Sequence, residues 1–341
     1  MKATGIQDTQ ADMHPSHKKS KTITYPYTIR TVLSENTRDE LKNIGDLLNI
    51  AIKSTDKKQE RIDKIYKGMT ENQIIERYLL CMPENEWDLL GKLVSYEKAC
   101  PLRNDSDLPA LTAGMYLGHD EEGYIIIPQE VKECFQTVCN SEFMVRRNKM
   151  TWLQQCVSMA NNLYGAMPLP VLVTLYNQHY TFQSNAMEIR AMLQIIPEAM
   201  RLYYQKDGFI CNILMTEENV SALERNRQTH VYYIPTQEEI EHEATGNIIY
   251  FTPPMIKQGM MKLHKYTSIS KDETLHVMKD VIDEMASGWG PKDILEELQS
   301  MQITIRKGDK KRLLELFAEW NRYTKKWVNC GYSDDEMEIQ E

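Results

Sequence analysis

The sequence predicts a mainly helical protein with short β-hairpins, of the α+β class. Apolar residues recur every three or four positions along most of the 341-residue chain, which is the spacing of buried helix faces. Two four-residue apolar runs, 124–127 and 231–234, each end at a proline and predict short strands. Because single cores rarely grow beyond about 300 residues, we expect several small domains.

The composition excludes some classes of protein. Hydrophobic residues make up 42% of the chain and charged residues 26%, as in ordinary soluble domains. No run approaches the ~20 apolar residues of a membrane span, and the first residues lack the apolar core of a signal peptide. We therefore expect a cytoplasmic protein without a membrane partner. The seven cysteines are scattered and form no CxxC pair, so they predict reduced, mostly buried thiols and no zinc site.

The N-terminal part predicts a polar, disordered tail at 1–24 and a helix, an extended link and a second helix at 25–70. Thr37 and Glu40 have the spacing of a capping box at the start of the first helix. The expected cap of the second helix is Ser54, Thr55 or Asp56, and the expected core positions are Leu41, Ile44, Leu48, Ile50, Ile62, Ile65 and Tyr66. This unit resembles the SAP and Rho N-terminal modules, which hold DNA or RNA.

Positive charge is concentrated at this end of an acidic chain. The first 67 residues carry 13 Lys and Arg against 9 Asp and Glu, whereas the formal net charge of the whole chain is −9. Cations beside the free N–H groups at the start of a helix favour phosphate binding. The expected nucleic-acid-binding residues are Lys53, Lys57, Lys58, Arg61 and Lys64. The alternative is a solvated helix face whose lysines pair with Glu60 and Asp63.

Residues 71–140 predict a degenerate winged-helix-like unit, because three helices are followed by a turn and a strand. The expected elements are helices near 71–81, 84–98 and 107–117, a turn at 118–123, the strand 124–127 and a further helix to about 139. The third helix carries no Lys or Arg and is flanked by acidic residues, so it would repel DNA phosphates. We expect this unit to contact protein.

Residues 141–245 predict a second winged-helix-like unit. The expected elements are helices at 150–164, about 168–179, 185–193, 197–206 and 217–226, a turn at 207–208, and strands at 209–215 and 231–234. Expected secondary contacts with a nucleic-acid backbone are Arg146, Arg147, Lys149, Arg190 and Arg201. Ordinary surface charges would account for these residues equally well.

Residues 246–341 predict a helical region, with helices at about 254–265, 271–287, 291–300 and 309–329. The last helix carries a broad apolar face that we expect to be core, with a partner-binding surface as the alternative. Its members are Leu313, Leu316, Phe317, Trp320, Tyr323 and Trp327.

Motifs of catalysis are missing from the sequence. There is no GxxxxGK[ST] loop, and His242 cannot belong to an HExxH helix because position 246 is glycine. We predict no catalytic residue, no metal and no cofactor. The alternative of an active site assembled from residues that are dispersed in the sequence remains.

The whole chain resembles a group of uncharacterised proteins of Gram-positive bacteria and their mobile elements, which join a Rho N-terminal or SAP-like module to winged-helix-like units. The resemblance lies in Asn-Leu-Tyr-Gly at 162–165, in Tyr-Tyr-Ile-Pro at 232–235 followed by Glu238 and Glu239, and in the segment 320–336. Some relatives continue into a cysteine-rich SEC-C zinc tail, and we expect no such metal site here.

These observations lead to one expected function and one alternative. We expect a non-enzymatic modular protein that binds nucleic acid weakly and without strong sequence preference through residues 25–70, while its helical units contact protein partners. The alternative is a pure interaction or adaptor protein without nucleic-acid binding. The choice between DNA and RNA stays open.

Overall fold

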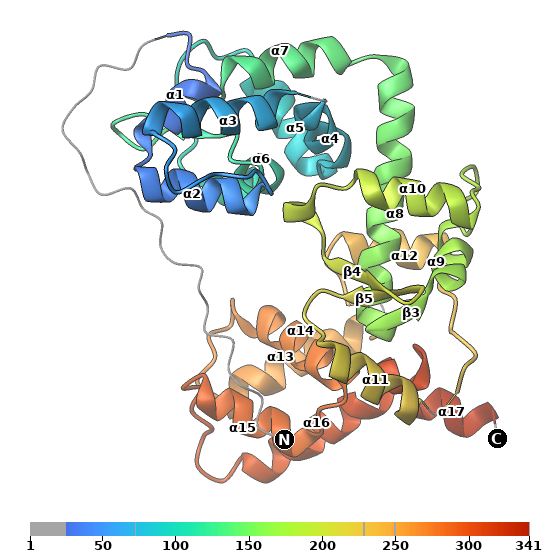
Figure 1. The fold of residues 1–341 in the computed structure, drawn as a ribbon. Coiled ribbons are helices and arrows are strands. Elements are labelled where there is room, and N and C mark those ends of the chain that lie inside the picture. Colours follow the sequence, from blue (N-terminus) through green and yellow to red (C-terminus); the bar gives the residue numbers. More distant parts are fainter. Residues whose placement is uncertain (1–24, 72, 228, 249, 341) are drawn as a thin grey trace. The chain divides into compact units, whose positions relative to one another are not determined.

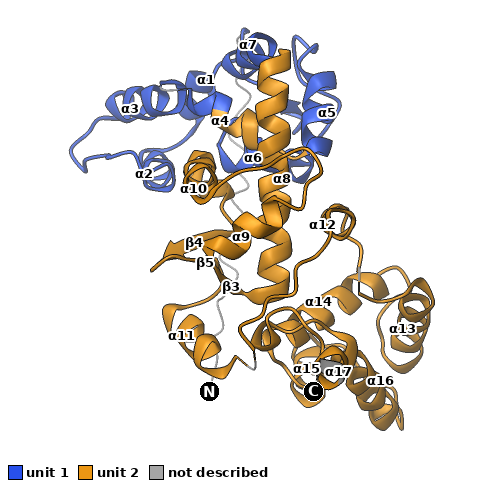
Figure 2. Ribbon diagram, turned by 90° about the vertical axis from the view of Figure 1, so that its right-hand side faces the viewer, with its two compact units in different colours: residues 1–76, 84–138 blue, residues 77–83, 139–341 orange. Residues whose placement is uncertain are grey.

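The computed structural model describes residues 25–71, 73–227, 229–248 and 250–340. The chain is mainly helical with two small antiparallel sheets, which confirms the predicted α+β class. It forms two compact units, one made of residues 1–76 and 84–138 and the other of residues 77–83 and 139–341 (Figure 2). The expected boundaries at 70 and 245 lie inside these units and remain predictions. The expected tail at 1–24 lies outside the described residues.

The N-terminal module contains α2 (Arg38–Leu47), a linker and α3 (Lys58–Thr70), as the sequence predicts (Figure 1). The capping box is confirmed, because the Thr37 hydroxyl accepts from the Glu40 N–H at 3.2 Å and the Glu40 carboxylate accepts from the Thr37 N–H. An additional helix, α1 (Ile29–Glu35), precedes them and was not expected from the sequence. Its buried residues are Ile29, Val32 and Leu33.

The linker of this module is held by two isoleucines that pack against glycines of the helices. A Cβ on Gly45 of α2 would lie 2.5 Å from Cγ1 of Ile52 and 3.1 Å from the carbonyl oxygen of Ile50. A Cβ on Gly68 of α3 would collide with the Ile50 side chain. The two glycines therefore allow the linker to lie directly against both helices.

The rest of the N-terminal unit is helical apart from one short hairpin. It comprises the start of α4 (Ile74–Cys81), α5 (Glu84–Leu93), the 3-10 helix η1 (Asp105–Asp107), α6 (Pro109–Ala113), the strands β1 (Gly118–His119) and β2 (Ile125–Ile126), and α7 (Gln129–Val138). The helix expected at 107–117 is shorter than predicted, because Met115 has a φ of 57° and leaves the helical conformation. Buried Glu86 accepts from the N–H groups of Ala110 and Leu111 and so caps α6.

The second unit begins with a long helix followed by a three-stranded sheet. Its elements are α8 (Ser141–Tyr164), β3 (Ala166–Pro168), α9 (Leu169–Tyr176), α10 (Ala186–Ile195), the 3-10 helix η2 (Glu198–Met200), β4 (Tyr203–Lys206) and β5 (Phe209–Asn212). The strand order is β3-β5-β4, and all pairings are antiparallel. Two helices therefore lie between the first and second strands of this sheet in chain order.

Two sequence-based predictions in this unit were wrong. The helix expected at 197–206 is replaced by η2 and β4, because Asp207 and Gly208 both have positive φ and form a tight turn that pairs β4 with β5. The segment 231–234 is not a strand of a sheet. Its Tyr233 N–H instead donates to the carbonyl oxygen of Cys330 at 3.0 Å.

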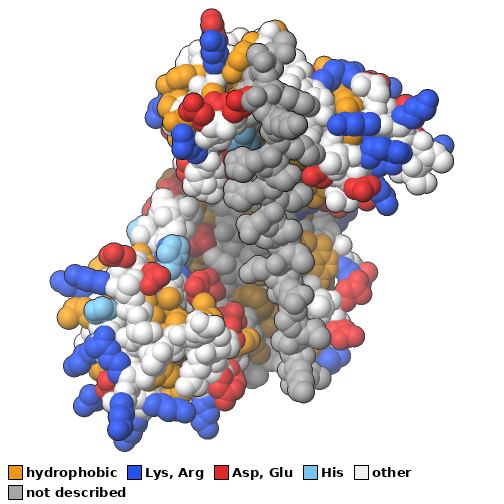
Figure 3. Space-filling view, turned by 90° about the vertical axis from the view of Figure 1, so that its left-hand side faces the viewer, with side chains coloured by type: hydrophobic (Ala, Val, Ile, Leu, Met, Phe, Trp, Pro, Cys, Tyr) orange, Lys and Arg blue, Asp and Glu red, His pale blue; other side chains and the backbone are white. Residues whose placement is uncertain are grey.

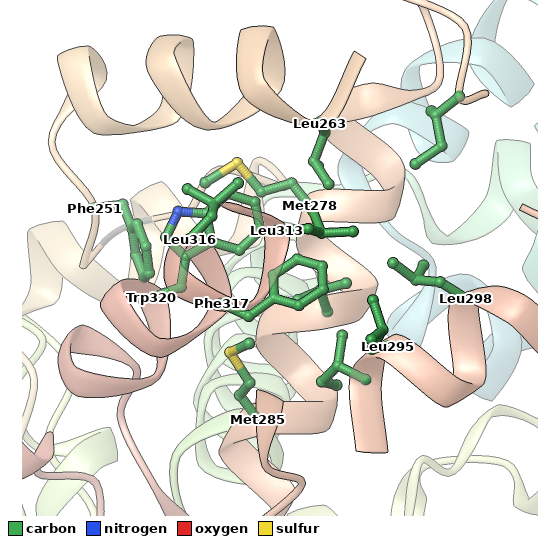
Figure 4. Close-up of a cluster of buried hydrophobic side chains, with 13 residues drawn as sticks. Phe251, Leu263, Met278, Met285, Leu295, Leu298, Leu313, Leu316, Phe317 and Trp320 are labelled. Atoms are coloured by element: carbon green, nitrogen blue, oxygen red, sulfur yellow. The ribbon is translucent and has the colours of Figure 1, made fainter. Parts of the chain in front are cut away.

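Helices form the remainder of the second unit. They are α11 (Glu217–Asn226), α12 (Gln237–Ala244), α13 (Pro253–Tyr266), α14 (Thr274–Ser287), α15 (Pro291–Ser300), α16 (Lys310–Tyr323), the 3-10 helix η3 (Trp327–Asn329) and α17 (Asp334–Gln340). Figure 4 shows Leu313 and Phe317 of α16 pointing toward Met278 of α14 and Leu295 of α15. Four of the six residues expected on the apolar face are buried in this core, namely Leu313, Leu316, Phe317 and Trp320.

The packing of the linker against α2 predicts opposite effects for alanine at two helical glycines. Gly45→Ala should lower the thermal midpoint of the N-terminal unit by an amount equivalent to about 1–3 kcal/mol, because the new methyl group overlaps Ile52. Gly91→Ala in α5 is the matched control, since its Cβ would only contact Phe135 at 3.7 Å. It should be neutral or stabilise by up to about 1 kcal/mol. Equal midpoints for the two variants would contradict this packing.

Candidate nucleic-acid interface

Arg61, which the sequence placed among the phosphate-binding residues, lies inside the N-terminal module. It is only 4% exposed. Its guanidinium donates to four backbone carbonyls: Nη1 to Arg38 at 2.6 Å, Nε to Asp56 at 3.1 Å, and Nη2 to Ser54 at 3.1 Å and Lys53 at 3.5 Å. These bonds fix the turn between the two helices. The prediction that Arg61 contacts a phosphate is therefore not compatible with its buried position.

Arg38 holds the same turn from the other helix. Its Nη2 donates to the carbonyl oxygen of Asp56 at 2.8 Å, which also accepts from Arg61. Because α2 and α3 each contribute one arginine, the carbonyl groups of Lys53, Ser54 and Asp56 are turned toward the protein. The side chains of Lys53, Ser54 and Thr55 are exposed, whereas Asp56 is buried.

Asp56 is a buried residue of the turn and does not cap α3 as the sequence predicted. Its Oδ2 accepts from the Lys53 N–H at 2.8 Å and from Lys64 Nζ at 2.6 Å. These hydrogen bonds, that of Lys64 first, lower the pKa of Asp56. The residue that precedes α3 is Lys57, whose N–H donates to Oε2 of Glu60 at 2.8 Å. The ammonium group of Lys64 therefore forms an ion pair inside the module and is only partly available to a ligand.

Three lysines remain on the outer surface of the turn and the start of α3. Lys53, Lys57 and Lys58 are all exposed. Lys58 Nζ donates to the carbonyl oxygen of Ser34 at 2.8 Å. Within the described part of the chain, the ammonium groups of Lys53 and Lys57 form no hydrogen bond or ion pair. Figure 3 shows Lys and Arg side chains gathered on this part of the N-terminal unit.

Carboxylates border this surface but pair mainly with other cations. Arg30 of α1 forms an ion pair with Asp63 and lies over the ring of Tyr66, 4.0 Å from its centroid. Lys67 lies 3.5 Å from Glu71. The alternative of a neutralised, solvated face therefore applies to the middle and end of α3 more than to the turn.

The five residues expected to make secondary contacts with a nucleic-acid backbone differ in their exposure to solvent. Arg147 is completely buried in α8, where Nη2 donates to the carbonyl oxygen of Met82 at 2.9 Å, so its predicted role at a surface is not compatible with its position. Arg201 is partly buried, and its Nε donates to the carbonyl oxygen of Ile196 at 2.9 Å. Arg146, Lys149 and Arg190 are exposed. These three residues differ from Arg147 in presenting their side chains to solvent.

A buried cationic and aromatic cluster in the second unit was missed by the sequence analysis. Lys325 has a side chain 6% exposed, and its Nζ lies 2.6 Å from Oε1 of Glu336 and 3.6 Å from the ring centroid of Tyr233. Arg227 donates to Glu224 Oε1 at 2.6 Å and packs beside Cys330. Both cations are enclosed, so removal of either carboxylate partner would leave a buried charge uncompensated.

This cluster brings together the three segments on which the whole-chain resemblance rests. The Trp327 indole N–H donates to the carbonyl oxygen of Asn162 at 3.0 Å, and the Tyr164 hydroxyl donates to the carbonyl oxygen of Tyr233. Burial raises the pKa of the Cys330 thiol, which disfavours the thiolate form that a nucleophile requires. The cluster is thus a structural junction between 162–165, 232–239 and 327–336.

One carboxyl group of the second unit has a strongly altered pKa. Glu243 of α12 is partly buried, and its Oε1 accepts from Asn162 Nδ2 at 2.5 Å. Burial, with the nearby negative charge of Asp283, raises the pKa of Glu243 to about 7. A proton acceptor near neutrality is a feature of many active sites, but structural groups share it.

Comparisons with known proteins found no match to this chain. No family model, curated protein sequence or solved structure matches it. The resemblances to SAP, Rho N-terminal and Gram-positive mobile-element proteins therefore stay predictions. Among residues 25–340 that the structure describes, no three His, Cys, Asp or Glu side chains are grouped to hold a metal ion. None of the described helices combines the length and apolar composition needed to cross a bilayer.

The hydrogen bonds of Arg61 predict a structural role that mutation can separate from charge. Arg61→Met keeps the apolar stem but removes one donor from each of four carbonyls, of which that of Asp56 keeps Arg38, so it should destabilise the module by about 2–4 kcal/mol. Lys57→Met removes the same charge from an exposed position and should change stability by less than about 0.5 kcal/mol. Hydrogen exchange of the α2 and α3 amides measures both. Similar protection in the two variants would show that Arg61 does not hold the turn.

The pKa of Glu243 predicts a pH dependence of stability. Its ordinary value is 4.5, and the folded value is about 7, so between these values the folded state keeps a proton that the unfolded state releases. Stability contributed by this group is present below about pH 4.5 and is lost as pH rises through about 7. Glu243→Gln should therefore be more stable than the wild type at pH 8 and similar to it at pH 5. Thermal unfolding at both pH values tests this, with exposed Glu241→Gln as the control.

Proposed function

We propose that this chain is a non-enzymatic nucleic-acid-binding protein that grips a phosphate backbone through its α2–linker–α3 module. The contacts are made by Lys53, Lys57 and Lys58, with Lys64 adding to the local field. Arg61 belongs to the support of this surface and does not touch the ligand. The helical units of the rest of the chain contact protein partners.

The observation that carries this proposal is the fixed turn at residues 53–56. Arg38 and Arg61 hold its carbonyl groups inward, so the lysines project from a backbone that does not have to be ordered on binding. Lys53 and Lys57 are exposed and have no ion pair with a described carboxylate. Their charge is therefore available to a ligand.

The same geometry supports weak binding without sequence preference. Three ammonium groups can neutralise about three phosphates, which corresponds to a log–log salt slope of roughly −2.7 on duplex DNA. Lysine acts toward a phosphate as a point charge, and these contacts carry no base-specific pattern. Strong discrimination between sequences would need side chains that reach base edges in a groove.

We also propose that residues 141–245 contain a winged-helix-like unit. Support comes from the order helix, strand, two helices and two strands, with the strand order β3-β5-β4 and the β4–β5 turn in the place of a wing. Arg190 of α10 and Lys206 of β4 line one shallow hollow at this turn. Lys206 forms an ion pair with Glu217, so Arg190 is the better placed of the two for a secondary backbone contact. The hairpin of residues 71–140 has only two strands, which supports a degenerate unit there.

A specific observation favours protein contact as the second candidate function. Leu202, Ile213 and Leu214 are 59%, 48% and 77% exposed beside the β4–β5 hairpin. The Ile213 N–H donates to the carbonyl oxygen of Leu202 at 3.1 Å, so these residues are neighbours. An exposed apolar group of this kind is typical of interaction sites. A pure adaptor would use it without binding nucleic acid.

Salt-dependent binding tests the proposal on the full-length protein. The variant Lys53→Gln/Lys57→Gln should lose about two phosphate contacts, which reduces the log–log salt slope by roughly 1.8. The affinity lost between 50 and 200 mM salt should then be about tenfold smaller than for the wild type. Fluorescence anisotropy of a labelled 20-base-pair duplex and a single strand provides the measurement.

A control of equal charge makes the outcome specific. Lys92→Gln/Lys98→Gln removes two exposed lysines of the same unit from outside the module and should leave the slope unchanged. If both double variants behave alike, the module does not bind nucleic acid. The adaptor function is then favoured.

A further inference from the structure

A second basic surface lies on the helical region of the second unit. Five cations occur within seven residues, from the end of the α15–α16 loop into the first turn of α16. Their side chains are all exposed. With Lys265 at the end of α13, they form what we call the C-terminal basic surface, which consists of Lys265, Arg306, Lys307, Lys310, Lys311 and Arg312.

Backbone pairing places the two parts of this surface together. Thr267 and Ile305 form an antiparallel bridge. The Ser268 N–H donates to the carbonyl oxygen of Thr304 at 2.8 Å, and the Arg306 N–H donates to that of Tyr266 at 2.9 Å. Lys265 and Arg306 are therefore next to the same bridge, and the loop that carries the cations has a fixed conformation.

Few carboxylates neutralise the C-terminal basic surface. Arg312 lies 2.9 Å from Asp309, and Lys311 lies 3.9 Å from Glu315, which is a long and solvent-exposed pair. Lys307 and Lys310 make no ion pair with the described residues. Figure 3 shows Lys and Arg side chains gathered on the surface of this helical region.

Local stability does not account for this arrangement. Cations in the first turn of a helix oppose its macrodipole, and each costs roughly 0.3–1 kcal/mol. Three of the cations, Lys310, Lys311 and Arg312, occupy that turn of α16. Their position is explained if these cations bind a negatively charged ligand.

We propose that the C-terminal basic surface binds the phosphate backbone of nucleic acid, independently of the N-terminal module. The cations are exposed and spread along a loop and two helices, so they fit an extended polyanion better than a small enclosed anion. Duplex DNA carries one negative charge per ~1.7 Å, whereas successive residues of an extended acidic peptide are about 3.3–3.6 Å apart. Five cations within seven residues give a high local density of positive charge, which favours the more highly charged polymer.

Two pairs of substitutions in the full-length protein separate this proposal from the N-terminal one. Lys307→Gln/Lys310→Gln should reduce the log–log salt slope for a labelled duplex by roughly 1.8, both in the wild type and in the Lys53→Gln/Lys57→Gln background. Lys257→Gln/Lys292→Gln, which removes two exposed lysines of α13 and α15, should leave the slope unchanged. The thermal midpoint of the Lys307→Gln/Lys310→Gln variant should equal or exceed that of the wild type, which excludes unfolding as the cause.

Each outcome decides one proposal. If Lys307→Gln/Lys310→Gln binds like the control pair, the C-terminal basic surface does not bind nucleic acid, whatever the N-terminal variant does. If only the N-terminal substitutions fail to change binding, the module proposal is wrong and the C-terminal one stands. Poly-glutamate of matched charge is the competitor. If it displaces the duplex from the Lys53→Gln/Lys57→Gln variant at an equal concentration of charge, the ligand is an acidic protein and the assignment to a phosphate backbone is overturned.

Discussion

A positive charge can be buried only if its N–H donors find acceptors, and this constraint decides which cations of the chain remain for a ligand. Arg61 meets it with three linker carbonyls and that of Arg38, and Lys325 meets it with Glu336 and three tyrosine rings. Arg227 meets it with Glu224 and the carbonyl oxygen of Ala166. Each of these cations joins segments that are distant in sequence or irregular in conformation. They are fixed parts of the fold.

The same constraint explains how the N-terminal module combines a small core with a basic surface. A ten-residue link has more carbonyl groups than two short helices can satisfy, and water would otherwise solvate them in a flexible loop. Arg38 and Arg61 take the place of that water on the inner side of the turn. Because Arg61 is buried beneath the turn, its charge adds to the potential around Lys53 and Lys57 without being available for direct contact, whereas Arg38 is exposed.

The sequence could predict the elements whose signals are local. Capping residues and apolar spacing placed the start of α2 and both ends of α11 within about one residue, because these signals depend only on neighbours along the chain. The strand β4 was missed because Tyr203–Lys206 becomes a strand only by pairing with β5. Likewise, the apolar run at 231–234 pairs with no described strand, and its Tyr233 N–H donates to the carbonyl oxygen of Cys330. Long-range strand pairing decides these cases, and it cannot be predicted from the local pattern of a single sequence.

The candidate site was harder to predict, since residue type does not distinguish a buried arginine from an exposed lysine. Counting charges over long segments also concealed the C-terminal basic surface. Residues 236–341 carry 14 Lys and Arg against 20 Asp and Glu, yet five of those cations lie within 306–312 beside a single aspartate. At physiological ionic strength charges are screened beyond about 8 Å. A ligand therefore responds to the cations within that distance, so the local arrangement of charge, more than the net charge of a segment, determines where a polyanion can bind.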